Sequence, residues 1–243
     1  MFQSVAGGLR RLVEAAETAL RDNGAHVHLG SAAQLARDGD RWRVKNDDGT
    51  TDTSHVIVTT PARVTGSLIE PFSPDGAAAL ASISYSSVAL TLLILPPGTI
   101  DVDASISGVL VPRNEGMHIT AVSFASHKWP GLAPDGAQVL RVSTGRRNRT
   151  SWQELSDEEL VDAIRSDLGQ IFTTEIPAGP SHVTRWMNAL PQYDVGHQDK
   201  VQKLDETMTS LSGLMVTGAW RDGLGLPACV GAGRSAVSEL FGH

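Results

Sequence analysis

The sequence predicts a mixed α/β protein, and three observations support this fold class. Apolar residues recur at helical spacing from Leu9 to Leu20. Apolar runs of strand length, such as Tyr85–Leu95, lie between turns rich in glycine and proline. From Val216 onward, a strand-like run leads through a glycine-rich loop into a helical pattern. Helical and strand patterns that alternate along one chain predict packed layers of both kinds of element.

The first part of the chain reads as one helix followed by short strands. Gly24 stands where the C-terminal cap of the helix belongs. Short strands are predicted at residues 25–29, 41–45 and 55–60. Asp-Gly pairs at 38–39 and 48–49 are typical of hairpin turns, so a small meander is expected here. Thr60 and Pro61 then suit the cap and the first position of a short helix.

The middle of the chain reads as a second unit, which begins at the proline-rich residues 70–74. Strands are predicted at residues 85–95, 107–111, 117–124, 137–144 and 181–186. Ser156 and Glu159 form a capping box, which predicts a helix with Leu160, Ile164 and Leu168 on its buried face. The chain then returns to the first unit through a helix around residues 201–211, a strand at 214–217 and the final helix.

Composition and charge exclude several classes of protein. With 243 residues, of which 41% are hydrophobic, the chain can bury a core in one or two domains. A net charge of −7 argues against a nucleic-acid partner and against strong attraction to anionic membranes. The single cysteine excludes an internal disulfide framework, and the start of the chain lacks a signal-peptide pattern. No apolar run is long enough for an integral membrane segment. We therefore predict a cytoplasmic location and leave peripheral membrane attachment open.

Four segments resemble the porphyrinogen oxidases of late haem synthesis, which belong to the flavin amine oxidase superfamily. Gly7-Gly8-Leu9-x-x-Leu12 is similar to the family's GGLxxLxxxL element, and residues 56–62 are similar to its last Rossmann strand. The run from Arg185-Trp186 to Pro191-Gln-Tyr193-x-x-Gly196-His197 resembles the stretch RWxxxxPQYxxGH, the most specific of the set. Residues 216–237 resemble the C-terminal motif that faces the flavin. These matches follow the family's order over nearly all of this chain.

The resemblance implies a partial Rossmann-like FAD-binding domain, residues 1–69 and 187–243, interrupted by a mixed-sheet substrate-binding domain, residues 70–186. Family members begin with a strand, a G-x-G-x-x-G turn and a helix. This chain opens at a point deep inside a full-length member, so we expect a C-terminal portion that lacks this unit. Gly231-Ala-Gly233 is a local look-alike, but no strand precedes it, and we expect it to pack as a helix face of small residues.

The resemblance also implies the activity: oxygen-dependent, FAD-dependent oxidation of a porphyrinogen to the porphyrin. Electrons pass stepwise to FAD, and molecular oxygen reoxidises the flavin with release of hydrogen peroxide. The flavin carries the difficult chemistry, while the protein supplies orientation and electrostatics. Protoporphyrinogen IX and coproporphyrinogen III differ by vinyl against propionate groups, and both remain candidate substrates.

Five positions carry over as candidate cofactor contacts, and no catalytic side chain or metal site is assigned. Leu224, Gly225 and Leu226 match the triplet that contacts the flavin, Trp186 matches a tryptophan at the flavin site, and Val27 matches a valine at the adenine half of FAD. The final helix, which should begin near residue 227 or 228, would direct its N-terminal dipole at negative charge on the flavin.

Simpler structural readings stand beside these assignments. Leu224 and Leu226 could pack a strand onto a helix, and Trp186 could belong to the core. The arginines at 141, 146, 147 and 149 could meet substrate propionates or form a solvated loop. His26 and His28 share one strand face, but two ligands do not make a metal site.

Three functional hypotheses follow. The first is a porphyrinogen oxidase whose present chain is inactive alone, because the flavin pyrophosphate lacks its seat. The second is a non-catalytic remnant, or one half of a split enzyme, that binds porphyrin or a partner such as a complementing N-terminal polypeptide or a second copy. The third is another flavin amine oxidase relative, which would need an aromatic cage where this loop offers only Trp220.

Overall fold

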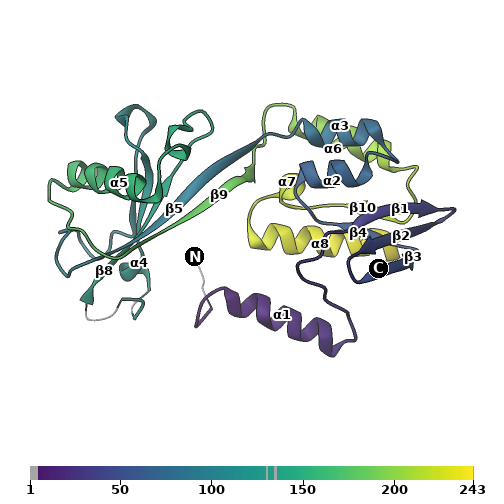
Figure 1. Cartoon of the computed structure of the whole chain (residues 1–243), viewed down its shortest axis with the longest axis horizontal. Helices are drawn as coiled ribbons and strands as arrows, with labels where there is room; N and C mark the ends of the chain where they lie inside the picture. Colours follow the sequence, from purple (N-terminus) through teal and green to yellow (C-terminus); the bar gives the residue numbers. More distant parts are fainter. Residues whose placement is uncertain (1–4, 130, 134–135, 243) are drawn as a thin grey trace.

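A computed structural model describes residues 5–129, 131–133 and 136–242, and it has two lobes joined by a pair of long strands (Figure 1). We call the first the large-sheet lobe. Its elements are β5 (Tyr85–Leu95), β6 (Gly108–Leu110), β7 (Ile119–Phe124), β8 (Gln138–Thr144), β9 (Ser181–Pro191), α4 (Ala125–Lys128), α5 (Asp157–Phe172) and the 3-10 turns Arg113–Glu115 and Ser151–Gln153. The strands pair throughout in antiparallel fashion, in the order β6-β7-β8-β5-β9.

The second lobe, the helical lobe, surrounds two small sheets. Its elements are β1 (Gln34–Asp38), β2 (Arg41–Asn46), β3 (Gly49–Thr53), β4 (Val56–Val58), β10 (Leu214–Val216), α2 (Ala62–Ile69), α3 (Pro74–Ala81), α6 (His197–Met208), α7 (Ala219–Asp222) and α8 (Leu226–Phe241). β1, β2 and β3 form the predicted meander, and β4 pairs in parallel with β10. α1 (Arg10–Asp22) precedes both lobes and lies apart from them in the view (Figure 1).

The core of the large-sheet lobe lies between one face of its sheet and α5. Alternate residues of β5, Ala89, Leu93 and Leu95, are buried there with Leu160 and Ile164 of α5. The capping box at the start of α5 forms as predicted, with both reciprocal hydrogen bonds present. The buried carboxylate of Asp167 accepts the backbone N–H groups of His118 and Ile119 at 2.6 and 3.0 Å, which fixes the start of β7 against α5.

The core of the helical lobe forms around two buried tryptophans. The Trp42 indole N–H donates to the Ser212 carbonyl oxygen at 2.9 Å, and its ring meets Phe72 edge-on at 5.2 Å. Trp220 lies in the same cluster, which also contains Leu80 and Ile83. These last two residues follow the predicted boundary at residue 70, so α3 packs with the helical lobe. The partition into residues 1–69, 70–186 and 187–243 stays a prediction.

Two local predictions are wrong, and the structure adds detail at two further places. Residues 25–29 form no strand, because the structure gives them no neighbouring strand to pair with. Pro61 is the N-cap of α2 and not its first helical residue. Residues 70–74 lead into α3, whose N-cap Ser73 accepts the Gly76 N–H. Residues 231–233 lie on α8, where Ala232 is buried but a side chain at Gly231 or Gly233 would meet open space, so only part of the small-residue face packs against a neighbour.

The sequence predicts no integral membrane segment, and the helices of the structure test this prediction. Across the residues that the structure describes, no helix is both long and apolar enough to cross a bilayer.

Candidate functional site

The second face of the large sheet is apolar and exposed. Trp186 on β9 pairs with Val88 on β5, and residues at alternate positions of β5 share its face, which places Leu92 and Ile94 there. The register of the pairs β6–β7, β7–β8 and β8–β5 places Leu110 of β6 on the same face. All four side chains are exposed, from 38% for Ile94 to 82% for Leu110. We call these four residues the open face; an apolar sheet face of this kind is typical of a binding surface.

The loop between β10 and α8 is the second exposed feature. α7 fills the middle of this loop, where the sequence had indicated no helix, and Gly223 follows it with a φ of 135°. A side chain at Gly223 would approach the Ala228 Cβ to 2.9 Å, so glycine is required there. Gly225 has an ordinary φ of −79°, and a side chain would meet only Pro227, at 3.7 Å. The backbone at Gly225 is therefore open to a ligand without being strained.

α8 begins at Leu226, slightly before the predicted start. Its N-cap, Gly225, provides no side-chain cap, and the first turn carries no acidic residue. The first N–H groups of a helix have no partner within the helix, and the dipole is positive there. This end of α8 points toward the large-sheet lobe (Figure 1). The start of α8 can therefore accept a flat or anionic group.

Trp220 fixes the loop to the rest of the lobe. Its side chain is only 1% exposed, and its indole N–H donates to the Thr60 carbonyl oxygen at 3.2 Å. Arg221 beside it binds the Asp205 carboxylate of α6 through both terminal nitrogens. Because Trp220 is buried, it offers no aromatic wall to a ligand, which removes the feature that an amine cage would need.

The run Pro191–His197 ties the end of β9 to the loop. The Tyr193 hydroxyl donates to the Ala219 carbonyl oxygen, and its ring lies tilted against His197 with centroids 4.6 Å apart. Burial raises the pKa of Tyr193 above its ordinary value, so the hydroxyl stays protonated and remains a donor. Gln192 donates to the Ser86 hydroxyl at 2.9 Å. This run therefore sets the position of the loop relative to the sheet.

Asp194 in the same run is held by Arg147 and Ser84. Arg147 Nη2 donates to Asp194 Oδ2 at 2.8 Å, and the Ser84 hydroxyl donates to it at 2.9 Å. The Arg147 guanidinium, followed by the Ser84 hydroxyl, lowers the pKa of the Asp194 carboxyl. A lowered pKa in the folded state means that the ionised carboxylate stabilises the fold above the unfolded pKa, and that this stability is lost as the pH falls through the folded value.

We therefore expect Asp194→Asn to lower the thermal midpoint at pH 7 and to have a shrinking effect as the pH falls below the ordinary aspartate range, about pH 3.9. Thermal unfolding of both proteins across this range would measure it. Asp40→Asn, at an exposed turn, is the matched control and should change little at any pH. A midpoint difference between Asp194→Asn and the parent that does not change with pH would contradict this account of the ion pair.

The structure places the five predicted cofactor contacts in three locations. Leu224 and Leu226 are 49% and 54% exposed at the start of α8, beside Gly225, so neither packs a strand onto a helix. Trp186 is 51% exposed on the open face and is not a core residue. Val27 lies in the non-helical segment between α1 and β1. Their contact with FAD stays a prediction.

Three of the four clustered arginines and one of the two histidines have structural partners. Arg146 and Arg149 donate to backbone carbonyl oxygens, Arg147 pairs with Asp194, and the His28 ring lies 2.7 Å from Asp48. In the parts of the chain that the structure covers, no group of three or more His, Cys, Asp or Glu side chains could hold a metal ion. Sequence reasoning missed the open face, although the continuous apolar run of β5 is the signal of a strand covered on both sides.

Comparison with known proteins relates these features to a family. A profile described as flavin containing amine oxidoreductase matches residues 2–240. Coproporphyrinogen III oxidase of Bacillus subtilis is 31% identical over 243 residues, covering 99% of this chain and 51% of that protein. The coproporphyrinogen III oxidase of Mycobacterium tuberculosis is 32% identical, again covering 99% of this chain and 51% of that protein. Protoporphyrinogen oxidase 1 of Arabidopsis thaliana is 29% identical over 247 residues, covering 95% of this chain and 45% of that protein.

Solved structures give the same picture. A protein from Exiguobacterium sp. 255-15, provisionally named a protoporphyrinogen oxidase, superposes with a TM-score of 0.85 at 28% identity, covering 98% of this chain and 51% of that one. A reduced UDP-galactopyranose mutase shares the fold, with a TM-score of 0.75 at 16% identity, covering 97% of this chain and 52% of that one. The chain spans about half the length of the curated relatives it matches. It belongs to the flavin containing amine oxidoreductase family, and its relatives there are named porphyrinogen oxidases.

Proposed function

We propose that this protein serves in FAD-dependent, oxygen-dependent oxidation of a porphyrinogen to the porphyrin in haem biosynthesis. One observation carries the proposal: the segments that resemble the family's flavin site, the loop at Leu224–Leu226 and Trp186, are both exposed on the folded chain. Apolar side chains that are exposed together in a patch mark a surface that binds a ligand or a partner. Their exposure supports a ligand between the open face and the start of α8.

The residues present fit a flavin. Leu224 and Leu226 supply apolar contact on either side of Gly225, where a ring edge can approach the backbone. The uncapped start of α8 supplies a positive field and free N–H groups. When bound, FAD accepts the electrons removed from the substrate. The chain's own contribution is to hold the flavin edge at Gly225, to favour negative charge there, and to exclude water with the open face.

Coproporphyrinogen III is the first substrate to test, because the bacterial relatives at 31–32% identity carry that name. Protoporphyrinogen IX is the second, on the similarity to the Arabidopsis thaliana protein. We further propose a cytoplasmic location, which the acidic composition and the single cysteine support.

The partner in this proposal is a polypeptide equivalent to the remaining half of the relatives. α1 supports it, because this helix buries none of its residues and leaves Leu9, Leu12, Val13 and Leu20 exposed. The apolar stripe of an amphipathic helix is expected to be buried against another part of the protein or a partner. Self-association through α1 is the competing arrangement, and a chain that binds porphyrin without flavin is the competing function.

The test is an FAD titration followed by visible absorption, run on this chain alone and on a mixture with the N-terminal half of the Bacillus subtilis relative. We expect stoichiometric bound flavin and turnover of a porphyrinogen in the mixture. Bound flavin on the chain alone would mean that its own segments suffice. Bound flavin in neither sample, with both proteins folded, would contradict the proposal and favour a non-catalytic remnant. Size-exclusion chromatography of each sample separates the complementing partner from self-association.

A further inference from the structure

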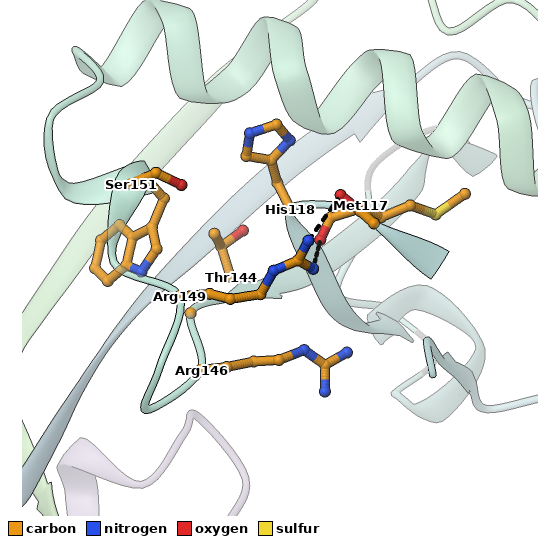
Figure 2. Close-up of a pocket in the computed structure, with 9 residues that line it drawn as sticks. Met117, His118, Thr144, Arg146, Arg149 and Ser151 are labelled. Atoms are coloured by element: carbon orange, nitrogen blue, oxygen red, sulfur yellow. Dashed lines mark hydrogen bonds between the residues drawn. The ribbon is translucent and has the colours of Figure 1, made fainter. Parts of the chain in front are cut away.

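A small cavity lies at the end of β8, next to α5 (Figure 2). Its volume is about 60 Å³, several times the roughly 10–15 Å³ that one water molecule requires. Its lining comes from two chain segments: Gly116, Met117 and His118 before β7, and Thr144, Gly145, Arg146, Arg149, Ser151 and Trp152 after β8. His118, Arg149 and Ser151 are exposed, whereas Thr144 and Trp152 are buried, so the cavity has an open mouth and a closed floor.

The floor carries polar atoms that have no partner. The Thr144 hydroxyl, the Trp152 indole Nε1 and Arg146 Nε are buried and make no hydrogen bond within the described chain. Thr144 is 1% exposed and Trp152 is 2% exposed. More than nine-tenths of buried polar groups in proteins have a partner, because an unpaired one is costly. Two of these atoms are N–H donors, and the hydroxyl can donate as well, so an occupant that accepts hydrogen bonds fits them.

The charge of the lining is positive. Arg149 donates to the carbonyl oxygens of Gly116 and Met117 at 3.4 and 3.3 Å (Figure 2), and Arg146 donates to that of Val111. These acceptors are neutral, and no acidic side chain lines the cavity. The Asp167 carboxylate accepts the backbone N–H groups of His118 and Ile119, and its Oδ2 lies 3.7 Å from Nδ1 of the His118 ring. Water would accept hydrogen bonds from the donors but would leave the charges of the two guanidinium groups uncompensated. An anion would accept the hydrogen bonds and also compensate the charges.

We propose that this cavity binds one small anion, with a carboxylate or a halide as the chemical class. Thr144 pairs with Ala89, whose side chain faces α5, whereas Trp186 pairs with the neighbouring Val88 on the opposite face. The site therefore lies on the other side of the sheet from the open face and is independent of any flavin or porphyrinogen. Its occupant is a free anion from solvent, and the small cavity favours an anion of about the size of acetate.

Thermal unfolding of the full chain at constant ionic strength tests the proposal. Sodium gluconate, whose anion is too large for the cavity, is replaced stepwise by chloride, formate or acetate. We expect the midpoint to rise and to saturate with at least one of these probes, as ligand binding to the native state requires. An unchanged midpoint with all three would overturn the proposal and leave the cavity to water.

Variants locate the effect. Trp152→Phe keeps the ring and removes the N–H, and Thr144→Val keeps the shape and removes the hydroxyl; each should raise the apparent dissociation constant at least tenfold. In gluconate, Thr144→Val should be as stable as the parent or more stable, because it removes an unpaired hydroxyl. If Trp152→Phe fails to fold, Thr144→Val alone still tests the site. Arg113→Gln removes a nearby charge outside the cavity and should keep the full response. An equal response in all variants would assign the effect to general salt binding and overturn the site.

Discussion

Gly225→Asn is expected to weaken FAD binding by about 100-fold, or about 2.7 kcal/mol, without weakening the fold. The fold tolerates a side chain here, because φ is −79° and the only neighbour is Pro227. Asparagine is also a better N-cap than glycine, so its side chain would bind the same first-turn N–H groups that we assign to the flavin. FAD titration of the complemented protein, with thermal unfolding of the variant chain, would measure both effects.

Gly231→Ala is the matched control for this prediction. Gly231 lies further along α8, where a side chain meets open space, so alanine should stabilise the helix by about 0.4–1 kcal/mol and leave FAD affinity unchanged. An unchanged FAD affinity in Gly225→Asn would place the flavin elsewhere and remove the main support for the proposed function.

Trp220→Ala should produce the largest loss of stability, about 3–5 kcal/mol in the free energy of unfolding. The side chain is almost wholly buried in the core of the helical lobe, and its N–H is bound to Thr60. Small domains have about 5–15 kcal/mol in total, so this loss is a large share. Urea unfolding would measure it. The loop at Leu224–Leu226 depends on this anchor, so FAD affinity should fall as well.

Trp220→Phe separates packing from hydrogen bonding. It keeps an aromatic ring in the core and removes the bond to Thr60, so we expect a loss of about 1–2 kcal/mol and an almost normal loop. If Trp220→Ala unfolded no more readily than Trp220→Phe, Trp220 would not be the anchor that we describe.

The parts of the fold that follow from local signals were predictable. The capping box at Ser156 and Glu159 defined α5, and the apolar run of β5 gave its bounds to the residue. Residues 25–29 looked like a strand but lack a pairing partner in the described chain, which no local pattern can reveal. α3 was missed because residues 70–74 were interpreted as the start of a second unit, although Ser73 and Pro74 are a cap and a first helical residue.

The candidate site was predicted as a set of positions and not as an arrangement. The resemblance indicated Gly225 and Trp186, but the exposure of the residues around them depends on how distant segments pack. The bonds that position the loop, from Tyr193 to Ala219 and from Trp220 to Thr60, join residues far apart in the sequence. The open face likewise required the register of five strands, which follows from turns and pairing that the sequence indicates only in part.

The two long strands have a consequence for how such proteins can be recombined. Their pairing is irregular between Ser86 and Val88, where the lobes meet, and opposite this point Asn188 adopts a φ of 48° and donates its N–H to the Ser87 hydroxyl. A bulge bends and twists a strand pair, and this one is locked by a side chain. A few residues on both strands therefore set the angle between the lobes. In a chimaera that takes one lobe from a relative, the two lobes should keep their relative orientation only if the bulge residues of both strands come from the same parent protein.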